Sequence, residues 1–516
     1  MRKKHYMLLA GLVLSIAAAI FFFDPKRPPA DDYARSVTHA MAGEDTPLGR
    51  AVAPRALSHR GESGFMLLSR GKDSLQWRLA AIEAAQRSLD IQYYMIENDN
   101  TGKLLLEAML RAADRGVRVR ILMDDLNLRG ADPTWPLLNA HSHIEIRIFN
   151  PFATRDEPVF TRVSNVFTGL GQFSKRMHNK ILVADNTLAI AGGRNLGDEY
   201  FDASGDFNFR DVDMLAVGPI VASMSRSFDS YWNGDEAFPL AALHPTPDNP
   251  QAVSGLRGLL QRHWQEEHIA ARAPVAGQLQ HGEVPLVWAK AELAVDAPSK
   301  INLPKEQVGS KPGLLLNRMA AKAKQEFIIV SPYFVPGEGG TEALKALVDK
   351  NISVKVLTNS LASSDAVAAH TGYRRYRQAL VEGGVELYEL KPAPGAHPHS
   401  SRFGSSSLSS LHSKIYVVDR RDVIVGSFNL DPRSVTLNTE MLLVIHSPEL
   451  AGQVITMFEK ATRPSASFHV VLQGKQLEWV STEEGQEQRE GAEPDAGLWR
   501  RIKVNLFSLL PLENQV

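Results

Sequence analysis

His178-Asn179-Lys180-Ile181-Leu182-Val183-Ala184-Asp185 returns in the same pattern as His412-Ser413-Lys414-Ile415-Tyr416-Val417-Val418-Asp419. Each stretch places a histidine and a lysine two residues apart, ahead of an apolar run that ends in aspartate. A short segment ending in asparagine follows each stretch at the same offset: Gly192-Gly193-Arg194-Asn195 and Gly426-Ser427-Phe428-Asn429. The sequence therefore contains a duplication, and we expect two related halves that each supply one copy of the motif.

Each copy offers the groups that displacement at a phosphodiester needs. Residues two apart on a strand project from the same face, so the histidine and the lysine of one copy can reach one phosphate. One histidine can serve as nucleophile and the other as proton donor, while cationic and amide groups hold the phosphoryl oxygens. The candidate catalytic residues are His178, His412, Lys180 and Lys414, and the candidate phosphate-binding residues are Lys180, Lys414, Asn195, Asn429 and Ser427. We expect neither a metal ion nor a cofactor.

Asp185 and Asp419 complete the two motif copies and belong with them to the candidate catalytic set. They lie five residues beyond the lysines. On a continuous strand, the alternation of side chains turns them away from the site. We therefore favour a structural role for both at the end of their strands.

Two further carboxylates are candidates for orienting the histidines. A histidine nucleophile must be neutral with a defined tautomer, which requires an acceptor on its other ring nitrogen. Asp211 and Glu440 occupy comparable places downstream of the two motifs, and each is followed by an apolar run. We predict that Asp211 orients His178 and that Glu440 orients His412.

Length and composition limit the classes of protein to consider. A chain of 516 residues is too long for one ordinary core, and 44% hydrophobic with 22% charged residues is typical of a folded globular protein. The formal net charge is -1, from 57 basic and 58 acidic residues, which argues against a dedicated nucleic-acid binder. Cysteine is absent. Its absence excludes disulfides, thiolate metal sites and a lipidated N-terminal cysteine.

The sequence of the N-terminus predicts a membrane segment. Arg2, Lys3 and Lys4 precede an uncharged run from Tyr6 to Phe23. A cleaved signal peptide is the alternative, but the apolar run continues past its small residues, so we favour an uncleaved anchor. Positive residues ahead of the span favour an N-terminus inside the cell, which places the catalytic body outside the cytoplasm.

The pattern along the chain divides it into six parts. These are a membrane anchor or signal segment (1–27), a tether (28–58), a first lobe (59–245), a connector (246–312), a second lobe (313–465) and a tail (466–516). Helical and strand-like segments alternate in both lobes in the same order, which predicts an α/β sandwich with a mixed sheet in each lobe. We expect two pseudo-symmetric α/β lobes sharing one central site, preceded by an N-terminal transmembrane helix.

The duplicated motif with its Gly-Gly or Gly-Ser step and asparagine resembles the phospholipase D superfamily. Further segments are similar to its bacterial cardiolipin synthase C branch, among them Leu89-Asp90-Ile91-Gln92-Tyr93-Tyr94 and Ser331-Pro332-Tyr333-Phe334-Val335-Pro336-Gly337. The resemblance implies phosphatidyl transfer in two steps, in which His178 forms a phosphatidyl-histidine and His412 protonates the departing alcohol. It also implies phospholipid substrates, with phosphatidylglycerol and phosphatidylethanolamine as candidates, and a membrane as partner.

Three functions remain open at this point. The sequence favours a membrane-associated phosphatidyltransferase of the cardiolipin synthase type. A phospholipase D that releases phosphatidic acid shares every catalytic residue, and a non-lipid phosphodiesterase or nuclease is the third candidate. We expect no nucleic acid as partner, and the sequence leaves the oligomeric state open.

Two other segments carry predictions. Asp124-Asp125 ends a predicted strand, and we interpret the pair as loop or capping carboxylates rather than as a metal site. In the tail, the acidic stretch Glu483–Glu493 is predicted to be disordered. Leu498–Leu510 is predicted to form an amphipathic helix, which either lies in an anionic membrane interface or docks on the body.

Overall fold

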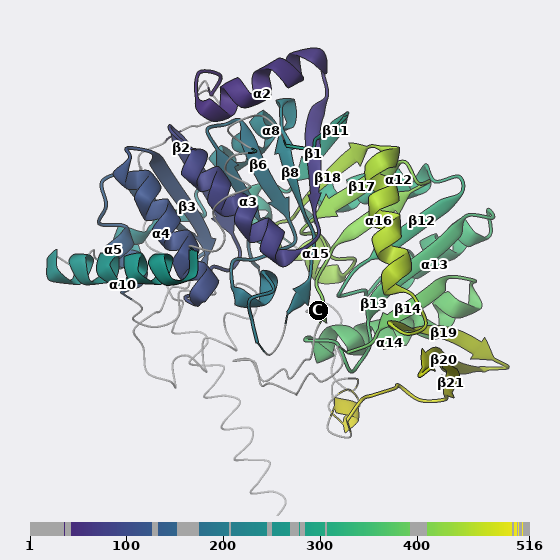
Figure 1. The fold of residues 1–516 in the computed structure, drawn as a ribbon. Helices are drawn as coiled ribbons and strands as arrows, with labels where there is room; N and C mark the ends of the chain where they lie inside the picture. Colours follow the sequence, from purple (N-terminus) through teal and green to yellow (C-terminus); the bar gives the residue numbers. More distant parts are fainter. Residues whose placement is uncertain are drawn as a thin grey trace, which may run out of the picture.

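The computed structural model has two α/β lobes packed side by side, coloured purple to teal and green to yellow in Figure 1. It describes residues 36, 43–125, 133–151, 175–205, 208–244, 250–268, 278, 284–304, 307–392, 410–497, 500–502, 504 and 508. The expected anchor, residues 1–27, lies outside these residues. Within the described ranges, no helix is both long and apolar enough to cross a bilayer. The prediction of two lobes with mixed sheets is confirmed.

The first lobe is built on a nine-stranded sheet in the order β10-β1-β8-β6-β5-β2-β3-β4-β9. Its elements are α2 (Pro47–Ser58), β1 (Ser63–Leu68), α3 (Gly71–Ala84), β2 (Ser88–Tyr93), α4 (Asn100–Asp114), β3 (Arg118–Asp124), α5 (Thr134–Leu138), β4 (Ile144–Phe149), β5 (Ile181–Ala184), β6 (Leu188–Gly192), η2 (Asp198–Tyr200), β7 (Phe209–Arg210), β8 (Asp213–Val217), α8 (Pro219–Trp232), β9 (Ala237–Pro239) and α9 (Leu240–Leu243). β2, β3 and β4 run parallel, and β5 joins β2 antiparallel.

The second lobe repeats this plan on a ten-stranded sheet in the order β11-β18-β17-β16-β12-β13-β14-β19-β20-β21. Its elements are α12 (Lys311–Ala321), β12 (Glu326–Val330), α13 (Gly337–Val348), β13 (Ser353–Asn359), α14 (Val367–Glu382), β14 (Glu386–Leu390), β15 (Ser410–Leu411), β16 (Ile415–Val418), β17 (Asp422–Gly426), α15 (Pro432–Thr436), β18 (Met441–His446) and α16 (Pro448–Ala461). The order β18-β17-β16-β12-β13-β14 matches β8-β6-β5-β2-β3-β4 strand for strand, so the duplication in the sequence is a duplication of the sheet.

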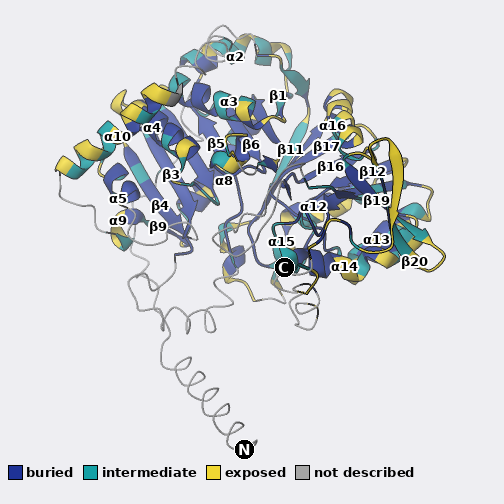
Figure 2. Cartoon of the chain, turned by 60° about the horizontal axis from the view of Figure 1, so that its bottom comes forward, coloured by how far each residue is buried: buried dark blue, intermediate teal, exposed yellow. Residues whose placement is uncertain are grey.

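The central strands are buried along nearly their whole length, as Figure 2 shows in dark blue for both sheets. Helices cover the outer face of each sheet. The inner faces pack on a shared core that contains Ile181 and Val183 of β5 and Ile415 and Val417 of β16, together with apolar residues of α8 and α16. Strands β5, β6 and β16 are almost uninterrupted apolar runs, as burial on both faces favours. β2 and β3 also bury polar side chains, among them Asp90, which pairs with Arg120 at 2.7 Å.

The connector contributes to both sheets. It contains α10 (Pro250–His268), β10 (Val287–Ala289), β11 (Ala291–Val295) and η3 (Pro298–Asn302). β10 pairs with β1 of the first lobe, and β11 pairs with β18 of the second. One residue, Lys290, separates the two strands, so the connector ties the lobes together at their sheet edges.

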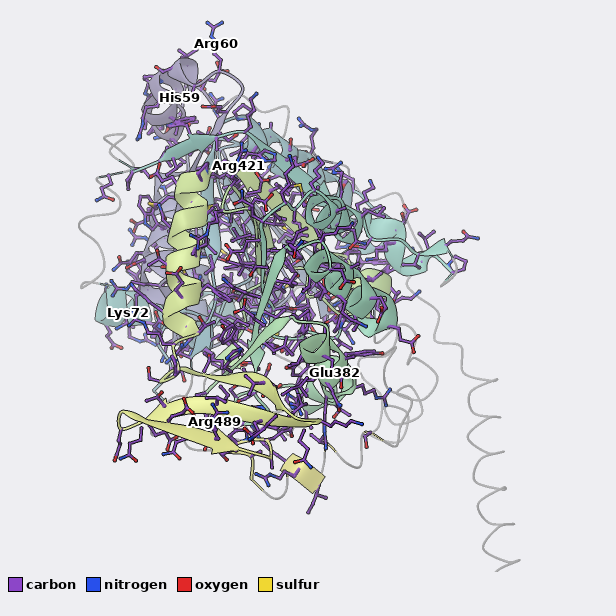
Figure 3. The ribbon with its side chains drawn as sticks, turned by 90° about the vertical axis from the view of Figure 1, so that its right-hand side faces the viewer. His59, Arg60, Lys72, Glu382, Arg421 and Arg489 are labelled. Atoms are coloured by element: carbon purple, nitrogen blue, oxygen red, sulfur yellow. The ribbon has the colours of Figure 1, made fainter. Side chains whose placement is uncertain are left out.

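The tail begins with three antiparallel strands, β19 (Ser467–Gln473), β20 (Gln476–Glu483) and β21 (Gln486–Glu490). The prediction of disorder for Glu483–Glu493 is therefore wrong. An exposed polar edge strand has no apolar alternation, so its sequence looks like that of a coil. Figure 3 labels Arg489 on β21 at the opposite end of the molecule from His59 and Arg60, which follow α2.

Most of the predicted amphipathic helix lies outside the described residues. Two of its described residues touch the body: Val504 is buried in a small cluster with Leu361, and the Arg500 guanidinium donates to the carbonyl oxygen of Leu361 at 2.7 Å. These contacts agree with docking on the body.

Candidate active site

Short strand pairings between the lobes set the position of each motif histidine. Met177 forms a parallel bridge with Thr439, and the His178 N–H donates to the Thr439 carbonyl at 2.9 Å. In the other copy, β15 pairs with β7, and the His412 N–H donates to the Arg210 carbonyl at 2.9 Å. Each histidine therefore sits beside the segment of the opposite lobe that carries the candidate orienting carboxylate.

His178 is paired with Glu440. Its Nδ1 lies 3.0 and 3.1 Å from the two carboxylate oxygens of Glu440 and 3.1 Å from the Ser427 carbonyl. Hydroxyl groups of Ser427 and Ser434 donate to the same carboxylate, at 2.5 and 3.0 Å. The carboxylate is thus held on both oxygens, and it favours the histidine tautomer with the proton on Nδ1.

His412 is paired with Asp211 across a distance of 2.6 Å between Nδ1 and Oδ2. The Asp211 carboxylate also accepts the Val212 N–H at 2.7 Å, and it is fully buried. The pKa of Asp211 is held well below its usual range, because the interactions with His412 and Lys414 outweigh the effect of burial.

The predicted pairing of carboxylates with histidines is wrong in its assignment. Asp211 contacts His412 and Glu440 contacts His178, so each acid serves the histidine of the other lobe. Proximity in the sequence suggested pairs within a lobe, whereas the bridges between the lobes exchange the partners.

Lys180 and Lys414 are buried, with 0% and 1% of their surfaces exposed. Each ammonium group donates to the carbonyl of its own motif histidine, at 2.6 Å for Lys180 and 2.5 Å for Lys414. Among the residues that the structure describes, neither lysine forms an ion pair with a carboxylate. Burial and the charge of Lys414 together lower the pKa of Lys180 to about 7, and burial lowers the pKa of Lys414 to about 8.

Both histidines are neutral in this environment. Burial lowers the pKa of His178 to about 4, against the raising effect of Glu440, and the charges of Lys180 and Lys414 act in the same direction as burial. Burial and Lys414 lower the pKa of His412 to about 3, against the raising effect of Asp211. Because Lys414 acts on His178 and Lys180 acts on His412, the two motifs share one electrostatic environment.

Both motif asparagines are buried. Asn195 bonds the Tyr200 hydroxyl through its Nδ2 at 2.9 Å, and the side-chain oxygens of Asn195 and Asn429 accept no hydrogen bond within the described part of the chain. Each unpartnered oxygen can accept a hydrogen bond from a ligand, whereas a phosphoryl oxygen needs the NH₂ group of the same amide as donor. Ser427 differs from its prediction as a phosphate-binding residue, because its hydroxyl donates to Glu440 and accepts the Met441 N–H at 3.0 Å.

Packing against Asp211 explains why position 193, in the segment Gly192-Gly193-Arg194-Asn195, is a glycine. A Cβ on Gly193 would lie 2.3 Å from Oδ1 of Asp211. The backbone therefore approaches the orienting carboxylate more closely than any side chain would allow.

Asp185 and Asp419 lie away from the histidines and make the same contacts in the two lobes. Asp185 accepts the N–H groups of residues 86–88 at 2.7–3.1 Å, and Asp419 accepts those of residues 324–326 at 2.8–3.1 Å. Both residues have positive φ, 52° and 51°. These contacts correct their inclusion among the candidate catalytic residues, because each carboxylate instead ties the turn after its motif strand to the segment ahead of β2 or β12.

Aromatic rings that the sequence reasoning missed line the histidines. The Tyr94 ring packs edge-on against His178 at 5.2 Å between centroids, and Tyr200 does the same against His412 at 5.3 Å. The Lys180 ammonium lies 5.4 Å from the Tyr94 ring centroid. Tyr94 directly follows β2, and Tyr200 lies five residues after Asn195, but neither position in the sequence indicates contact with a histidine.

The connector also reaches the site. Asp296 accepts the Glu440 N–H at 3.1 Å and pairs with Lys300 at 2.7 Å. In the ranges that the structure describes, no three His, Cys, Asp or Glu side chains gather in a set that could hold a metal ion.

Comparison with known proteins identifies relatives of this chain. Residues 79–232 and 316–462 match the family model described as cardiolipin synthase, PLD-like domain. Cardiolipin synthase C of Escherichia coli (strain K12) is 36% identical over 475 residues, which cover 90% of this chain and 99% of that protein. Cardiolipin synthase B of Salmonella typhimurium is 27% identical over 382 residues, 74% of this chain and 76% of that protein.

A solved structure shares the fold. The crystal structure of phosphatidylserine synthase from Haemophilus influenzae Rd KW20 covers 91% of this chain and 100% of its own, with a TM-score of 0.55 and 12% identity. At that identity, the likeness shows the two-lobed fold alone.

Proposed function

This chain belongs to the phospholipase D-like cardiolipin synthase family, and we propose that it transfers a phosphatidyl group between lipids through a covalent phosphatidyl-histidine. The donor is a glycerophospholipid, with phosphatidylglycerol and phosphatidylethanolamine as the candidates. The acceptor is the free glycerol hydroxyl of phosphatidylglycerol, and the product is cardiolipin.

In the first step, Nε2 of His178 forms a bond to phosphorus while the bond from phosphorus to the headgroup oxygen breaks. His412 gives its proton to that oxygen. In the second step, His412 takes the proton of the acceptor hydroxyl, the acceptor oxygen bonds to phosphorus, and the bond to His178 breaks. The order of the two histidines follows the resemblance to the superfamily, and the Nδ1 contacts to Glu440 and Asp211 leave Nε2 of each ring for the reaction.

Two buried lysines, neither of which pairs with a carboxylate of the residues that the structure describes, carry this proposal. Burying an ammonium group without a counter-ion is costly, and the cost falls when an anion enters. A phosphodiester placed between Lys180 and Lys414 supplies that charge, and Asn195 and Asn429 supply amide groups. In the free enzyme the pKa of His412 is about 3. The bound anion raises this pKa, so that His412 can carry the proton that it donates.

Two features support a lipid rather than a nucleic acid as substrate. The net charge of -1 offers no general attraction for a polyanion. A cavity of about 760 Å³ lies between α12 and α13, and its lining contains Phe428 and Leu430, the chain neighbours of Asn429, with further apolar side chains such as Leu344 and Leu347. An apolar cavity next to the phosphate-binding loop is suited to hydrocarbon.

We further place the enzyme at the bacterial inner membrane, held by a single N-terminal anchor, with its catalytic body in the periplasm. The basis is the apolar run Tyr6–Phe23 behind three basic residues. A C-terminal epitope that is digested by protease added to spheroplasts supports this orientation, and a protected epitope contradicts it.

The decisive experiment is expression in cells that lack cardiolipin, followed by lipid analysis. Cardiolipin should return with the wild type and not with His178→Ala. His446→Ala is the matched control, because His446 also bonds a carboxylate, Asp422 at 2.7 Å, but lies exposed outside the site. Accumulation of phosphatidic acid without cardiolipin would instead establish hydrolysis.

A second assay separates the two steps. A diacylglycerol phosphodiester of p-nitrophenol releases a phenolate that needs no proton, so the first step then depends on His178 alone. The wild type should release about one nitrophenolate per enzyme in a burst before steady turnover. Phosphopeptide mapping should find the label on the peptide containing His178, and a label on His412 would reverse the roles.

A further inference from the structure

The residue that ends β13 holds the backbone just ahead of His412. Asn359 is 2% exposed, and its side chain makes two hydrogen bonds to Leu411. Nδ2 donates to the Leu411 carbonyl at 3.0 Å, and Oδ1 accepts the Leu411 N–H at 2.9 Å. The amide side chain thus pairs with Leu411 as a neighbouring strand would, and His412 is the next residue.

The residue that ends β3 makes the corresponding contact in the first lobe. Asp124 is fully buried, and its Oδ2 accepts the Met177 N–H at 2.9 Å, directly ahead of His178. Its Oδ1 forms an ion pair with Arg176 at 3.1 Å. β3 begins opposite the first residue of β2, as β13 begins opposite the first residue of β12, so Asp124 and Asn359 occupy equivalent positions in the two sheets.

Each histidine is therefore held from two sides. Its own N–H donates to the opposite lobe, at Thr439 or Arg210, while the N–H of the preceding residue donates to the strand end of its own lobe. A histidine fixed in this way keeps its ring in line with the carboxylate across the interface. Displacement of a reacting group by about 1 Å can cost about 100-fold in rate, so this anchoring has a kinetic consequence.

We propose that Asp124 and Asn359 are a matched pair of positioning residues, Asp124 for His178 and Asn359 for His412. The pair is not interchangeable. Leu411 presents both an N–H and a carbonyl, which an amide can satisfy together, whereas Asp124 accepts the Met177 N–H and also pairs with Arg176. The assignment of the two residues to separate steps rests on the proposed function.

The two-step assay tests this assignment. Asn359→Ala should slow turnover of an ordinary phospholipid donor about 10- to 100-fold, because His412 must then move protons from a loosened position. The rate of the nitrophenolate burst should stay within about threefold of wild type. Asp124→Ala should slow the burst itself, and Asp124→Asn, which keeps an acceptor for the Met177 N–H, should recover part of that loss.

Thr358→Val is the matched control, because Thr358 precedes Asn359 on the same strand, is equally buried, and donates to Pro332 rather than to Leu411. A burst that falls as much as steady turnover in Asn359→Ala, or an effect no larger than that of Thr358→Val, would overturn the proposal.

An NMR measurement separates failure of this inference from failure of the proposed function. Asn359→Ala should broaden or shift the imidazole signals of His412 while leaving those of His178 unchanged, whatever reaction the enzyme performs. If the wild type shows no burst but the signals respond in this way, the proposed function falls and the positioning pair stands. If the His412 signals do not respond, the positioning pair falls.

Discussion

Because each histidine pairs with a carboxylate of the other lobe, two similar substitutions should impair different histidines. Glu440→Gln and Asp211→Asn each replace a buried carboxylate with an amide of the same shape. If the contacts of the structure hold in solution, Glu440→Gln impairs His178 and Asp211→Asn impairs His412. If each acid served the histidine of its own lobe, the two results would change places.

The magnitude for Glu440→Gln follows from its contacts. Its carboxylate accepts from His178, Ser427 and Ser434 together, and an amide offers one acceptor oxygen and one NH₂ group in their place. A hydrogen bond to a charged group contributes about 1.5–3 kcal/mol. The NH₂ group can also face Nδ1 and select the wrong tautomer, a change that costs about 10⁴ in kcat in Ser-His-Asp enzymes. We expect a fall of about 10³- to 10⁴-fold, or ~4–5.5 kcal/mol.

The nitrophenyl donor gives the readout. Glu440→Gln should lose the rapid burst. Asp211→Asn should keep a burst of about one equivalent and lose steady turnover, because its His178 remains paired. Asp422→Asn controls for loss of a carboxylate beside a histidine away from the site. A full burst in Glu440→Gln, or its loss in Asp211→Asn with unchanged thermal stability, would refute the exchange.

Three further predictions concern the same residues. Lys180→Met should abolish transfer yet raise the thermal midpoint at pH 6, because the folded-state pKa of about 7 lies below the ordinary 10.5. The unfolded state then binds more protons between about pH 7 and 10.5, so wild-type stability should rise with pH across that window. Lys180→Met should show a smaller rise in urea titrations, because Lys414, with a pKa of about 8, still contributes. With the nitrophenyl donor, which needs no proton from His412, kcat/KM should fall as pH rises through about 7–8, where the lysines of the free enzyme lose their charge, with no acid limb above about pH 5; a limb near pH 6.5 would contradict the burial of the histidines. Asp185→Ala should lower the free energy of unfolding by about 2–4 kcal/mol, because three backbone N–H groups lose their acceptor, while kcat of the folded enzyme at low temperature stays near wild type.

The sequence predicted the parts of the site that depend on local pattern. The two motif copies and the common order of their strands are visible as periodicity and repetition. The same alternation predicted that Asp185 would face away from the histidines. Its carboxylate does so, and it accepts backbone N–H groups. His178 and Lys180 were predicted on the motif strand itself, but β5 begins only at Ile181, because the residues ahead of it bridge to the other lobe.

The parts that escaped prediction depend on contacts between distant segments. Nothing near Asp211 in the sequence indicates that β7 pairs with β15, a contact of two residues on each side. The role of Asn359 was equally hidden, because an asparagine at a strand end is ordinary until Leu411 is placed beside it. Ser427 looked like a phosphate ligand because of its place in the motif, whereas packing turned its hydroxyl to Glu440.

The exchange of acids also explains why the two lobes must stay in register. Within either lobe alone, the motif histidine lacks its carboxylate, since Glu440 reaches His178 and Asp211 reaches His412 only across the interface. The bridges that set these contacts are the same ones that receive the N–H groups of the histidines. A shift of one lobe by a single residue would break both bridges and both histidine–carboxylate pairs together. Lobe packing and histidine tautomer are thus one coupled property, and the apolar core between β5 and β16 stabilises the chemistry as well as the fold.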